Sequence, residues 1–238
     1  MIIYGRNSIE EAIYSNISLK QVWIIRGKEN KYPGLIQKIR HNNIKINPIS
    51  EKEIEKISRT QKHQGIAAEI ILPENIIEEE ENFKDLDRLH SVLILDGITD
   101  TGNLGAIVRS ALLFNIDAVI LPKDNSARIT PQVIKASAGA IYKQRVIYVN
   151  NINTFITLLK EDDFTIYGLS ATAEEDIDKI RFNKKICLVV GSEREGLRKS
   201  VKKQCSVMIK IPTSRKIDSL NVSVASAIAM WEVFKNFS

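Results

Sequence analysis

The chain has 238 residues, of which 44% are hydrophobic and 26% are charged, with few glycines and prolines. This composition excludes a disordered or fibrous protein and provides enough apolar side chains for one large core or two smaller ones. The formal net charge of +5 suits a polyanionic partner, although many enzymes that act on small metabolites share such a balance.

No segment of the sequence has the pattern of a membrane span or of a secretion signal. The apolar runs fall short of the roughly 18 residues that cross a bilayer, and the first residues lack a basic stretch followed by a long apolar one. The two cysteines, Cys187 and Cys205, form no CxxC pair, which is typical of reduced thiols rather than of a metal site. We therefore expect a soluble cytoplasmic protein that binds neither a metal nor a membrane.

Residues 1–75 carry the pattern of a compact α/β domain. The expected elements are, in order, a helix near Asn7–Tyr14, a strand at Gln21–Ile25, a helix at Pro33–Arg40, a strand at Ile44–Asn47, a helix at Glu51–Ser58 and a strand at Ile66–Ile71. Ser50, with Glu53 three residues later, forms a capping-box pattern that begins the third helix.

Residues 76–90 are acidic and weakly periodic, and they include the run Glu78–Glu81. The residues on both sides of this stretch carry an excess of Lys and Arg over Asp and Glu. Such a composition is typical of a solvated segment between domains. We interpret the chain as a domain of residues 1–75, a linker of residues 76–90 and a second domain of residues 91–238.

Short apolar runs recur in the second domain, with helical patterns between several of them. They lie at Val92–Leu95, Ala118–Leu121, Arg145–Val149, Thr165–Leu169, Cys187–Val190 and Val207–Ile211. The first and fifth runs do not alternate polar and apolar side chains, which is typical of strands buried on both faces of a parallel sheet. The pattern predicts an α/β domain with its ligand at the carboxyl ends of the strands, beside the loops after Leu95, Val190 and Ile211.

The loop after Leu95 runs from Asp96 to Gly105 and leads into a helix that contains Arg109. Its glycines and the small polar side chain of Asn103 allow backbone amides to face an anion such as an RNA phosphate, although an ordinary glycine turn with a capped helix has the same features. Arg109 lies in the first two turns of a largely apolar helix, where a charge needs a partner; a simple surface arginine is the alternative.

The loops after Val190 and Ile211 are the other two candidates. The first contains Gly191 and Gly196, which permit a tight turn or the close approach of a ligand; a plain strand-to-helix turn with solvated charges is the alternative. The second leads into a helix with an apolar stripe, made of Val224, Ile228, Trp231 and Phe234. This stripe predicts packing against a core or against a second subunit.

These three loops, in this order, resemble the motifs of the SPOUT superfamily of RNA methyltransferases, specifically its TrmH/RlmB group of ribose 2′-O-methyltransferases. The first motif is represented by Asn103, Gly105 and Arg109 with Ser110-Ala111, the second by Gly191, Glu193, Gly196 and Leu197, and the third by Pro212 and Ser219–Ala225. Residues 4–12, 63–65 and 128–140 are also similar to this group, so the resemblance spans essentially the whole chain. The sequence departs from the group at Thr213 and Arg215, where Met and then Gly are frequent.

The resemblance implies a fold and an assembly. The C-terminal domain is expected to be an α/β trefoil knot with a mostly parallel sheet, in which the loops after late strands thread to form the cofactor pocket. The N-terminal domain looks like a small ribosomal-protein-like α/β domain that binds RNA. A homodimer packed through the C-terminal helix is implied, with the arginine of one subunit facing the cofactor of the other.

The resemblance also implies an activity, which is transfer of a methyl group from S-adenosyl-L-methionine to a guanosine ribose in large-subunit (23S) ribosomal RNA. The residues expected around the reacting ribose and phosphate are Asn103, Arg109, Glu193, Ser219 and Asn221. The residues expected to bind the cofactor are Leu169, Gly191, Gly196, Ile211 and Leu220. The residues expected to contact structured RNA are Arg6, Lys28, Lys31, Lys62 and Arg128.

The role of Arg109 is open to two interpretations. The arginine of the first motif has been regarded as a general base in this group, but a guanidinium stays protonated at neutral pH. We therefore expect Arg109 to hold a phosphate, while solvent or a phosphate oxygen accepts the proton.

Three alternatives remain at this stage. The first is 2′-O-methylation of tRNA by the same chemistry. A non-catalytic RNA-binding or ribosome-assembly factor of the same fold is the second, which Arg215 keeps open. A dinucleotide-dependent oxidoreductase would suit the parallel sheet, but the sequence lacks a GxGxxG fingerprint after the first strand.

Overall fold

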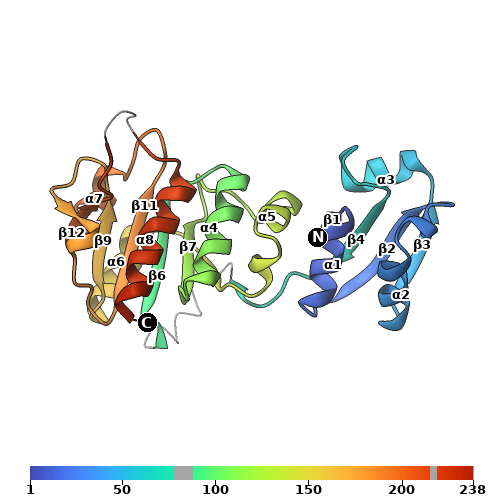
Figure 1. The fold of residues 1–238 in the computed structure, drawn as a ribbon, viewed down its shortest axis with the longest axis horizontal. Helices are drawn as coiled ribbons and strands as arrows, with labels where there is room; N and C mark the ends of the chain where they lie inside the picture. The colour runs from blue at the N-terminus through green and yellow to red at the C-terminus, as the bar shows by residue number, and fades with distance from the viewer. Residues whose placement is uncertain (78–87, 215–218, 238) are drawn as a thin grey trace.

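The computed structural model describes residues 1–77, 88–214 and 219–237. Two sheets form the centres of two domains that lie side by side along the long axis (Figure 1). The acidic run Glu78–Glu81 and Arg215 lie outside the described residues.

The N-terminal domain is a four-stranded sheet with strand order β1-β4-β2-β3. Its elements are β1 (Ile2–Tyr4), α1 (Arg6–Tyr14), β2 (Leu19–Ile25), a 3-10 turn at Glu29–Lys31, α2 (Pro33–His41), β3 (Lys45–Ile49), α3 (Glu51–Ser58) and β4 (Ile66–Ile70). The capping box at the start of α3 is confirmed, because the Ser50 amide donates to Glu53 Oε2 at 2.7 Å and the Glu53 amide donates to Ser50 Oγ.

The C-terminal domain is an eight-stranded sheet with order β10-β12-β9-β11-β6-β7-β8-β5, and every pair of neighbours is parallel. The strands are β5 (Ile76–Ile77), β6 (Ser91–Asp96), β7 (Ala118–Pro122), β8 (Val146–Val149), β9 (Thr165–Leu169), β10 (Glu175–Asp176), β11 (Ile186–Gly191) and β12 (Val207–Lys210). Strand β5 lies in residues 76–90, the segment expected to be a linker. The first two residues of this segment therefore extend the second sheet.

Strand β11 lies between β6 and β9, although it follows both in the sequence. Its residues pair in register with β6, from Ile186 opposite Ser91 to Gly191 opposite Asp96. The two strands therefore end together, and the loops that leave them start from adjacent positions. Threading of the chain through a trefoil knot stays a prediction.

The sheet is apolar on both faces, as the non-alternating runs predict. Along β6, Leu93 and Leu95 belong to one hydrophobic cluster and Val92 and Ile94 to the other. The helices are α4 (Thr101–Leu113), α5 (Pro131–Ala136), α6 (Ile152–Glu161), α7 (Lys199–Lys202) and α8 (Val222–Phe237), with 3-10 turns at Ala140–Tyr142 and Ile177–Lys179. Helices α4 and α8 pack side by side over one face of the sheet (Figure 1).

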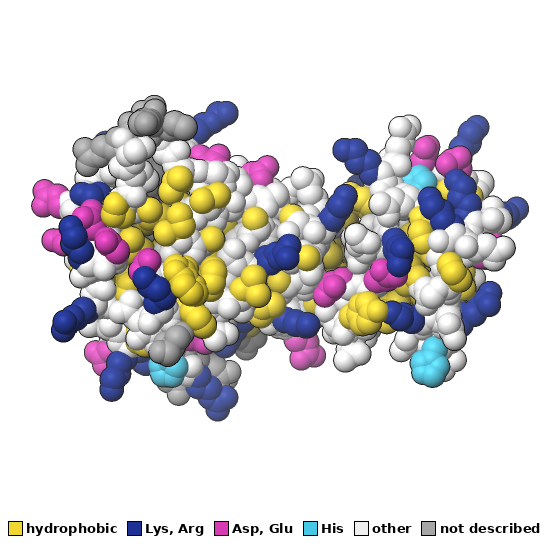
Figure 2. Space-filling view, in the orientation of Figure 1, with side chains coloured by type: hydrophobic (Ala, Val, Ile, Leu, Met, Phe, Trp, Pro, Cys, Tyr) yellow, Lys and Arg dark blue, Asp and Glu magenta, His cyan; other side chains and the backbone are white. Residues whose placement is uncertain are grey.

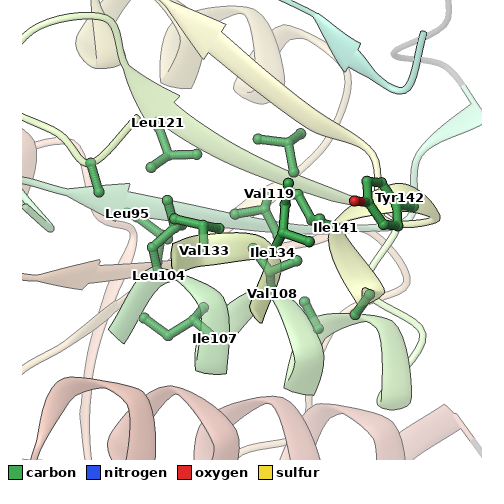
Figure 3. Close-up of a cluster of buried hydrophobic side chains, with 14 of the residues drawn as sticks. Leu95, Leu104, Ile107, Val108, Val119, Leu121, Val133, Ile134, Ile141 and Tyr142 are labelled. Atoms are coloured by element: carbon green, nitrogen blue, oxygen red, sulfur yellow. The ribbon is translucent and has the colours of Figure 1, made fainter. Parts of the chain in front are cut away.

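Helix α4 packs closely against α5 and against strands β6 and β7. Figure 3 shows Leu104, Ile107 and Val108 of α4 beside Val133 and Ile134 of α5 in one buried cluster. The close approach requires Gly105, because a Cβ at this position would lie 2.4 Å from Ala136 Cβ and 2.9 Å from the Val133 carbonyl oxygen. Packing against α5 thus fixes the position of the part of the first motif that contains Gly105.

The N-terminal domain contacts the C-terminal domain near α5. The side chain of Glu11 on α1 fills the space beside Gly139, where a Cβ would lie 1.8 Å from Glu11 Cγ. The side-chain Nδ2 atom of Asn75 donates to the Ile141 carbonyl at 3.0 Å and to the Gln144 carbonyl. The first domain is therefore attached beside the helix that supports α4.

Replacement of Gly105 by alanine is expected to lower the free energy of unfolding by about 2–4 kcal/mol, because backbone atoms of α5 leave no space for the methyl group. Chemical denaturation measures this change. The matched control is Gly34→Ala on α2, where nothing lies within 4 Å of the added Cβ. This control should leave stability equal or raise it by about 0.5–1 kcal/mol; equal effects of the two substitutions would contradict the packing account.

Candidate active site

A cavity of about 1240 Å³ opens at the carboxyl ends of β9, β11 and β12. Three segments line most of it. They are residues 169–172 at the end of β9, residues 190–197 at the end of β11, and residues 208, 210–214, 219, 220, 222 and 225 from β12 to the start of α8. The remaining described lining residues are Asp176 and Lys202. This position agrees with the rule that parallel α/β sheets bind ligands at the carboxyl edge.

The loop after β11 is a tight turn. The Gly196 amide donates to the Ser192 carbonyl at 2.9 Å, and the Ser192 amide donates to the Gly196 carbonyl at 3.2 Å. Gly196 has a positive φ of 66°, and a Cβ on Gly191 would lie 2.1 Å from the Gly196 carbonyl carbon. Both glycines are therefore needed for the turn, which presents Glu193 at its start.

The Glu193 carboxylate joins three segments that are far apart in the sequence. Its Oε1 atom accepts hydrogen bonds from Asn221 Nδ2 at 2.5 Å, from the Val222 amide at 3.2 Å and from Asn103 Nδ2 at 3.3 Å. Asn221 Nδ2 also donates to Asn103 Oδ1 at 3.1 Å. Three of the five residues expected at the reacting ribose thus form one hydrogen-bonded network.

Two helices begin at this network, and side chains cap both of them. Asp100 Oδ1 accepts a hydrogen bond from the Asn103 amide at 2.7 Å at the start of α4. Asn221 Oδ1 accepts from the Ser223 amide at 2.9 Å and from Ser223 Oγ at 2.6 Å at the start of α8. The positive ends of two helix dipoles therefore lie beside the cavity, which favours anionic groups there.

The comparisons with known proteins agree with this geometry. Residues 90–231 match the model of the SpoU rRNA Methylase family, and residues 2–75 match the model of the RNA 2′-O ribose methyltransferase substrate binding domain. The chain belongs to the SpoU rRNA methylase family. The resemblance drawn from the three loops is confirmed, and S-adenosylmethionine is the cofactor expected for this family of methyltransferases.

Several relatives match over nearly the whole chain. A protein from Staphylococcus haemolyticus, named as a TrmH family tRNA/rRNA methyltransferase, is 33% identical over 239 residues, which are 99% of this chain and 95% of the relative. A crystal structure of an RNA 2′-O ribose methyltransferase is 25% identical with a TM-score of 0.78, over 100% of this chain and 88% of the other. The SpoU methyltransferase AviRb from Streptomyces viridochromogenes, solved in complex with AdoMet, shares the fold with a TM-score of 0.79 at 16% identity, over 100% and 90%.

The five residues expected to bind the cofactor of this methyltransferase all line the cavity. They are Leu169, Gly191, Gly196, Ile211 and Leu220. Ser219 and Glu193 line it as well, and so does Thr213 at the departure from the family pattern. Sequence reasoning missed Ser170 and Thr172, whose hydroxyl groups lie 3.1 Å apart on the cavity wall.

Arg109 does not join the network of Asn103, Glu193 and Asn221. It is exposed on α4, it does not line the cavity, and no hydrogen bond or ion pair to it is found within the described part of the chain. The α4 face that carries Arg109 and Leu113 is exposed in the single chain, where water stabilises the charge, and the expected role of Arg109 stays a prediction.

Four of the five expected RNA contacts gather at one edge of the N-terminal sheet. Arg6 follows β1, Lys28 and Lys31 follow β2, and Lys62 precedes β4, which is antiparallel to both strands. All four are exposed. The fifth residue, Arg128, is exposed on the other domain, where it donates to the Lys123 carbonyl at 2.7 Å and lies over the Tyr148 ring.

Other classes of site find no support among the described residues. They contain no group of three or more His, Cys, Asp or Glu side chains that could hold a metal ion. Burial raises the pKa of the Cys205 thiol to about 11 and the pKa of the Cys187 thiol well above its usual value, so both stay protonated. None of the described helices combines the length and apolar character needed to cross a membrane.

A buried ion pair that sequence reasoning did not single out holds the far end of the turn. Asp96, whose side chain has no exposed area, ends β6 and accepts hydrogen bonds from the Arg198 amide at 2.9 Å and from Arg198 Nε at 2.6 Å. Arg198 directly follows Leu197, which lines the cavity. The signal available in the sequence was Asp96, a polar residue that directly follows the apolar run Val92–Leu95.

Removal of the Arg198 side chain is expected to destabilise the methyltransferase, because it leaves the buried Asp96 carboxylate with one backbone donor. Since Arg198 is half exposed, we expect Arg198→Ala to lower the free energy of unfolding by about 2–3 kcal/mol. The control is Lys199→Ala, which removes an exposed positive charge one residue away and should cost less than about 0.5 kcal/mol. Equal losses in a denaturant titration would show that the ion pair does not hold the loop.

Proposed function

We propose that this protein methylates the 2′-hydroxyl of a guanosine in large-subunit ribosomal RNA, with S-adenosylmethionine as methyl donor. The observation that carries the proposal is the network of Asn103, Glu193 and Asn221 at the edge of a cavity large enough for a nucleoside-sized ligand. An assembly factor of the same fold has no evident need for such a network. The cytoplasmic location expected from the sequence stays part of this proposal.

The cavity residues fit S-adenosylmethionine. The volume of the cavity exceeds the range of about 300–1,000 Å³ that is usual for small-molecule pockets. The cavity therefore has room for the ligand and for part of an RNA nucleotide. Leu169, Leu197, Ile211 and Leu220 offer apolar walls to the adenine and methionine parts, and the absence of a side chain at Gly191 allows close approach to the backbone. When bound, this group supplies an electrophilic methyl carbon on a sulfonium.

The chain's own residues then have positioning tasks. Most of the rate gain in such a transfer comes from holding the attacking oxygen in line with the methyl carbon. The Asn103 and Asn221 side chains hold Glu193. Ser219, which is exposed and lines the cavity, contacts the ribose in this proposal. Arg109 holds the adjacent phosphate with a paired set of N–H donors.

Arg109 acts across a two-fold axis in this proposal. Its exposed position and its absence from the cavity lining of its own chain support an action on the cavity of a partner subunit. The surface around it supports dimer formation, because the large apolar side chains Leu113, Val224 and Trp231 are 65%, 47% and 44% exposed. Figure 2 shows apolar side chains gathered over α4 and α8 on this face. Isolated exposed apolar residues are common, but a patch on two packed helices marks an interface.

The domain arrangement supports ribosomal RNA as the target. The basic edge of the N-terminal domain, with Arg6, Lys28, Lys31 and Lys62, provides phosphate contacts at a distance from the cavity. A structure of an rRNA methyltransferase from Sinorhizobium meliloti matches 100% of this chain, whereas a structure concerned with 2-OH methylation of C/U34 on tRNA matches 62%. The layout with a separate binding domain therefore favours ribosomal RNA over tRNA.

The proposal is tested by mapping 2′-O-methyl groups in ribosomal RNA and tRNA from cells with and without this protein. We expect one guanosine of the large-subunit RNA to lose its methyl group, and purified protein with S-adenosylmethionine to restore it. Loss of a methyl group from tRNA alone would support tRNA as the target. Calorimetry that detects no binding of S-adenosylmethionine would favour a non-catalytic factor.

The Arg109 side chain is expected to act through its geometry and not through charge alone. Both Arg109→Ala and Arg109→Lys should lower kcat by about 100-fold or more, since one ammonium cannot replace paired donors. Steady-state assays on the RNA substrate measure this. The matched control is Arg145→Lys, at a position away from the cavity lining, which should retain activity. Full activity of Arg109→Ala would remove any catalytic role for this residue.

Introduction of a charge into the apolar patch is expected to separate the subunits. Leu113→Glu should convert the dimer to a monomer and lower activity by about 100-fold, with little effect on folding because Leu113 is largely exposed in the single chain. Sedimentation equilibrium and an unfolding curve give both quantities. Ile71→Glu, at an exposed site on the N-terminal domain, is the control and should stay dimeric. An unchanged dimer for Leu113→Glu would place the interface elsewhere.

A further inference from the structure

The two oxygens of the Glu193 carboxylate have different surroundings. Oε1 accepts three hydrogen bonds, from Asn221 Nδ2, the Val222 amide and Asn103 Nδ2. No hydrogen bond to Oε2 is found from any residue that the structure describes. One oxygen is therefore fully occupied by structural donors, while the other keeps its capacity to accept a proton or a hydrogen bond.

The residue that carries this free oxygen lines the cavity. Glu193 lines the cavity, and so does Val222, whose amide is one of the three donors to Oε1, whereas Asn103 and Asn221 do not. The three donors occupy Oε1 and leave Oε2 as the oxygen of this lining residue that is available to a ligand. A carboxylate whose orientation is fixed in this way needs no reorganisation when a substrate hydroxyl arrives.

The other titratable groups nearby are less suited to accept a proton. Asp176 also lines the cavity, but Lys179 Nζ at 2.6 Å lowers the pKa of its carboxyl, with a further contribution from Lys210. Glu195 lies at the tip of the turn, and among the described residues no hydrogen bond or ion pair joins it to the other two loops. The described lining contains no histidine, and a guanidinium such as that of Arg109 stays protonated.

We infer that Glu193 Oε2 accepts the proton of the ribose 2′-hydroxyl during methyl transfer. This inference rests on the proposed function. The 2′-oxygen forms a bond to the methyl carbon, the carbon–sulfur bond breaks with its electron pair going to sulfur, and the O–H proton moves to Oε2. The products are a 2′-O-methyl ether, a neutral thioether and a neutral carboxylic acid, which later releases its proton to water.

The charge balance supports this assignment. A sulfonium cation and a carboxylate anion are consumed together, so the step leaves no new charge in the cavity. The 2′-oxygen becomes strongly acidic as its bond to carbon forms, so a carboxylate is a sufficient base for a late proton transfer. Neither solvent nor an RNA phosphate is then required as the acceptor.

The substitution Glu193→Gln separates proton acceptance from structure. The glutamine carbonyl oxygen accepts from the same three donors that hold Oε1, and its amide nitrogen takes the place of Oε2 without the capacity to accept a proton. We expect S-adenosylmethionine affinity by calorimetry and RNA affinity by fluorescence anisotropy to stay within about twofold of wild type. We expect kcat to fall by about 100-fold or more, the usual contribution of a general base.

A dependence on pH provides a second readout. Hydroxide can replace the missing base, so kcat of Glu193→Gln should rise about tenfold per pH unit between about pH 7 and 9, while wild type changes much less. The control is Glu161→Gln, which neutralises an exposed carboxylate at the end of α6, away from the cavity lining, and which should retain wild-type kcat. Both measurements use the full-length protein.

The outcomes separate this inference from the proposed function. If wild type methylates RNA and Glu193→Gln does so equally fast, Glu193 is not the proton acceptor while the proposed function stands. If Glu193→Gln binds S-adenosylmethionine more than about tenfold more weakly at unchanged kcat, the carboxylate is a charge contact and the inference is wrong. If wild type methylates no RNA, the proposed function fails and the inference fails with it.

Discussion

The arrangement of the active site depends on one carboxylate oxygen that accepts hydrogen bonds from two distant parts of the chain. Glu193 Oε1 connects the turn after β11 with Asn103, 90 residues earlier, and with Asn221, 28 residues later. Since hydrogen bonds to a charged group are stronger than neutral ones, this network fixes the starts of α4 and α8 relative to the turn. The cavity wall, the helix N-termini and the free carboxylate oxygen all take their positions from it.

The sheet makes this network possible. Strand β11 is inserted beside β6 in a register that ends both strands at the same level, with Gly191 opposite Asp96. Asp96 then fixes Arg198 at the far end of the turn, while Glu193 fixes its near end. The turn is thus held at both ends by carboxylates, one buried and one at the cavity wall. Packing of Gly105 against α5 adds a third constraint on the same side of the sheet.

Much of the fold and of the candidate site was predictable from the sequence, because these features depend on patterns among residues that are close together in the chain. The unbroken apolar runs indicated strands buried on both faces, Ser50 and Glu53 indicated a helix start, and the three loops indicated the family. The strand order was not predictable from such patterns, since pairing of β11 with β6 joins segments far apart in the sequence. The Asp96–Arg198 pair depends on that pairing, which explains why it was missed.

The exposure of Arg109 shows a second limit. Its neighbours in the sequence are apolar, but helical periodicity directs Ile107 and Val108 into the core and Arg109 away from it. A largely apolar helix therefore does not imply a buried charge, because an apolar outer face can belong to an interface. The location of the arginine outside its own cavity is what a site shared between two subunits requires.

The most direct test of the central claim is a crystal structure of the protein with S-adenosylmethionine bound. The account predicts that the ligand occupies the cavity against Gly191 and Leu220, with its methyl carbon on the side of Glu193 Oε2 and with Glu193 Oε1 still bonded to Asn103 and Asn221. A ligand bound elsewhere, or a structure in which these three side chains are apart, would contradict it.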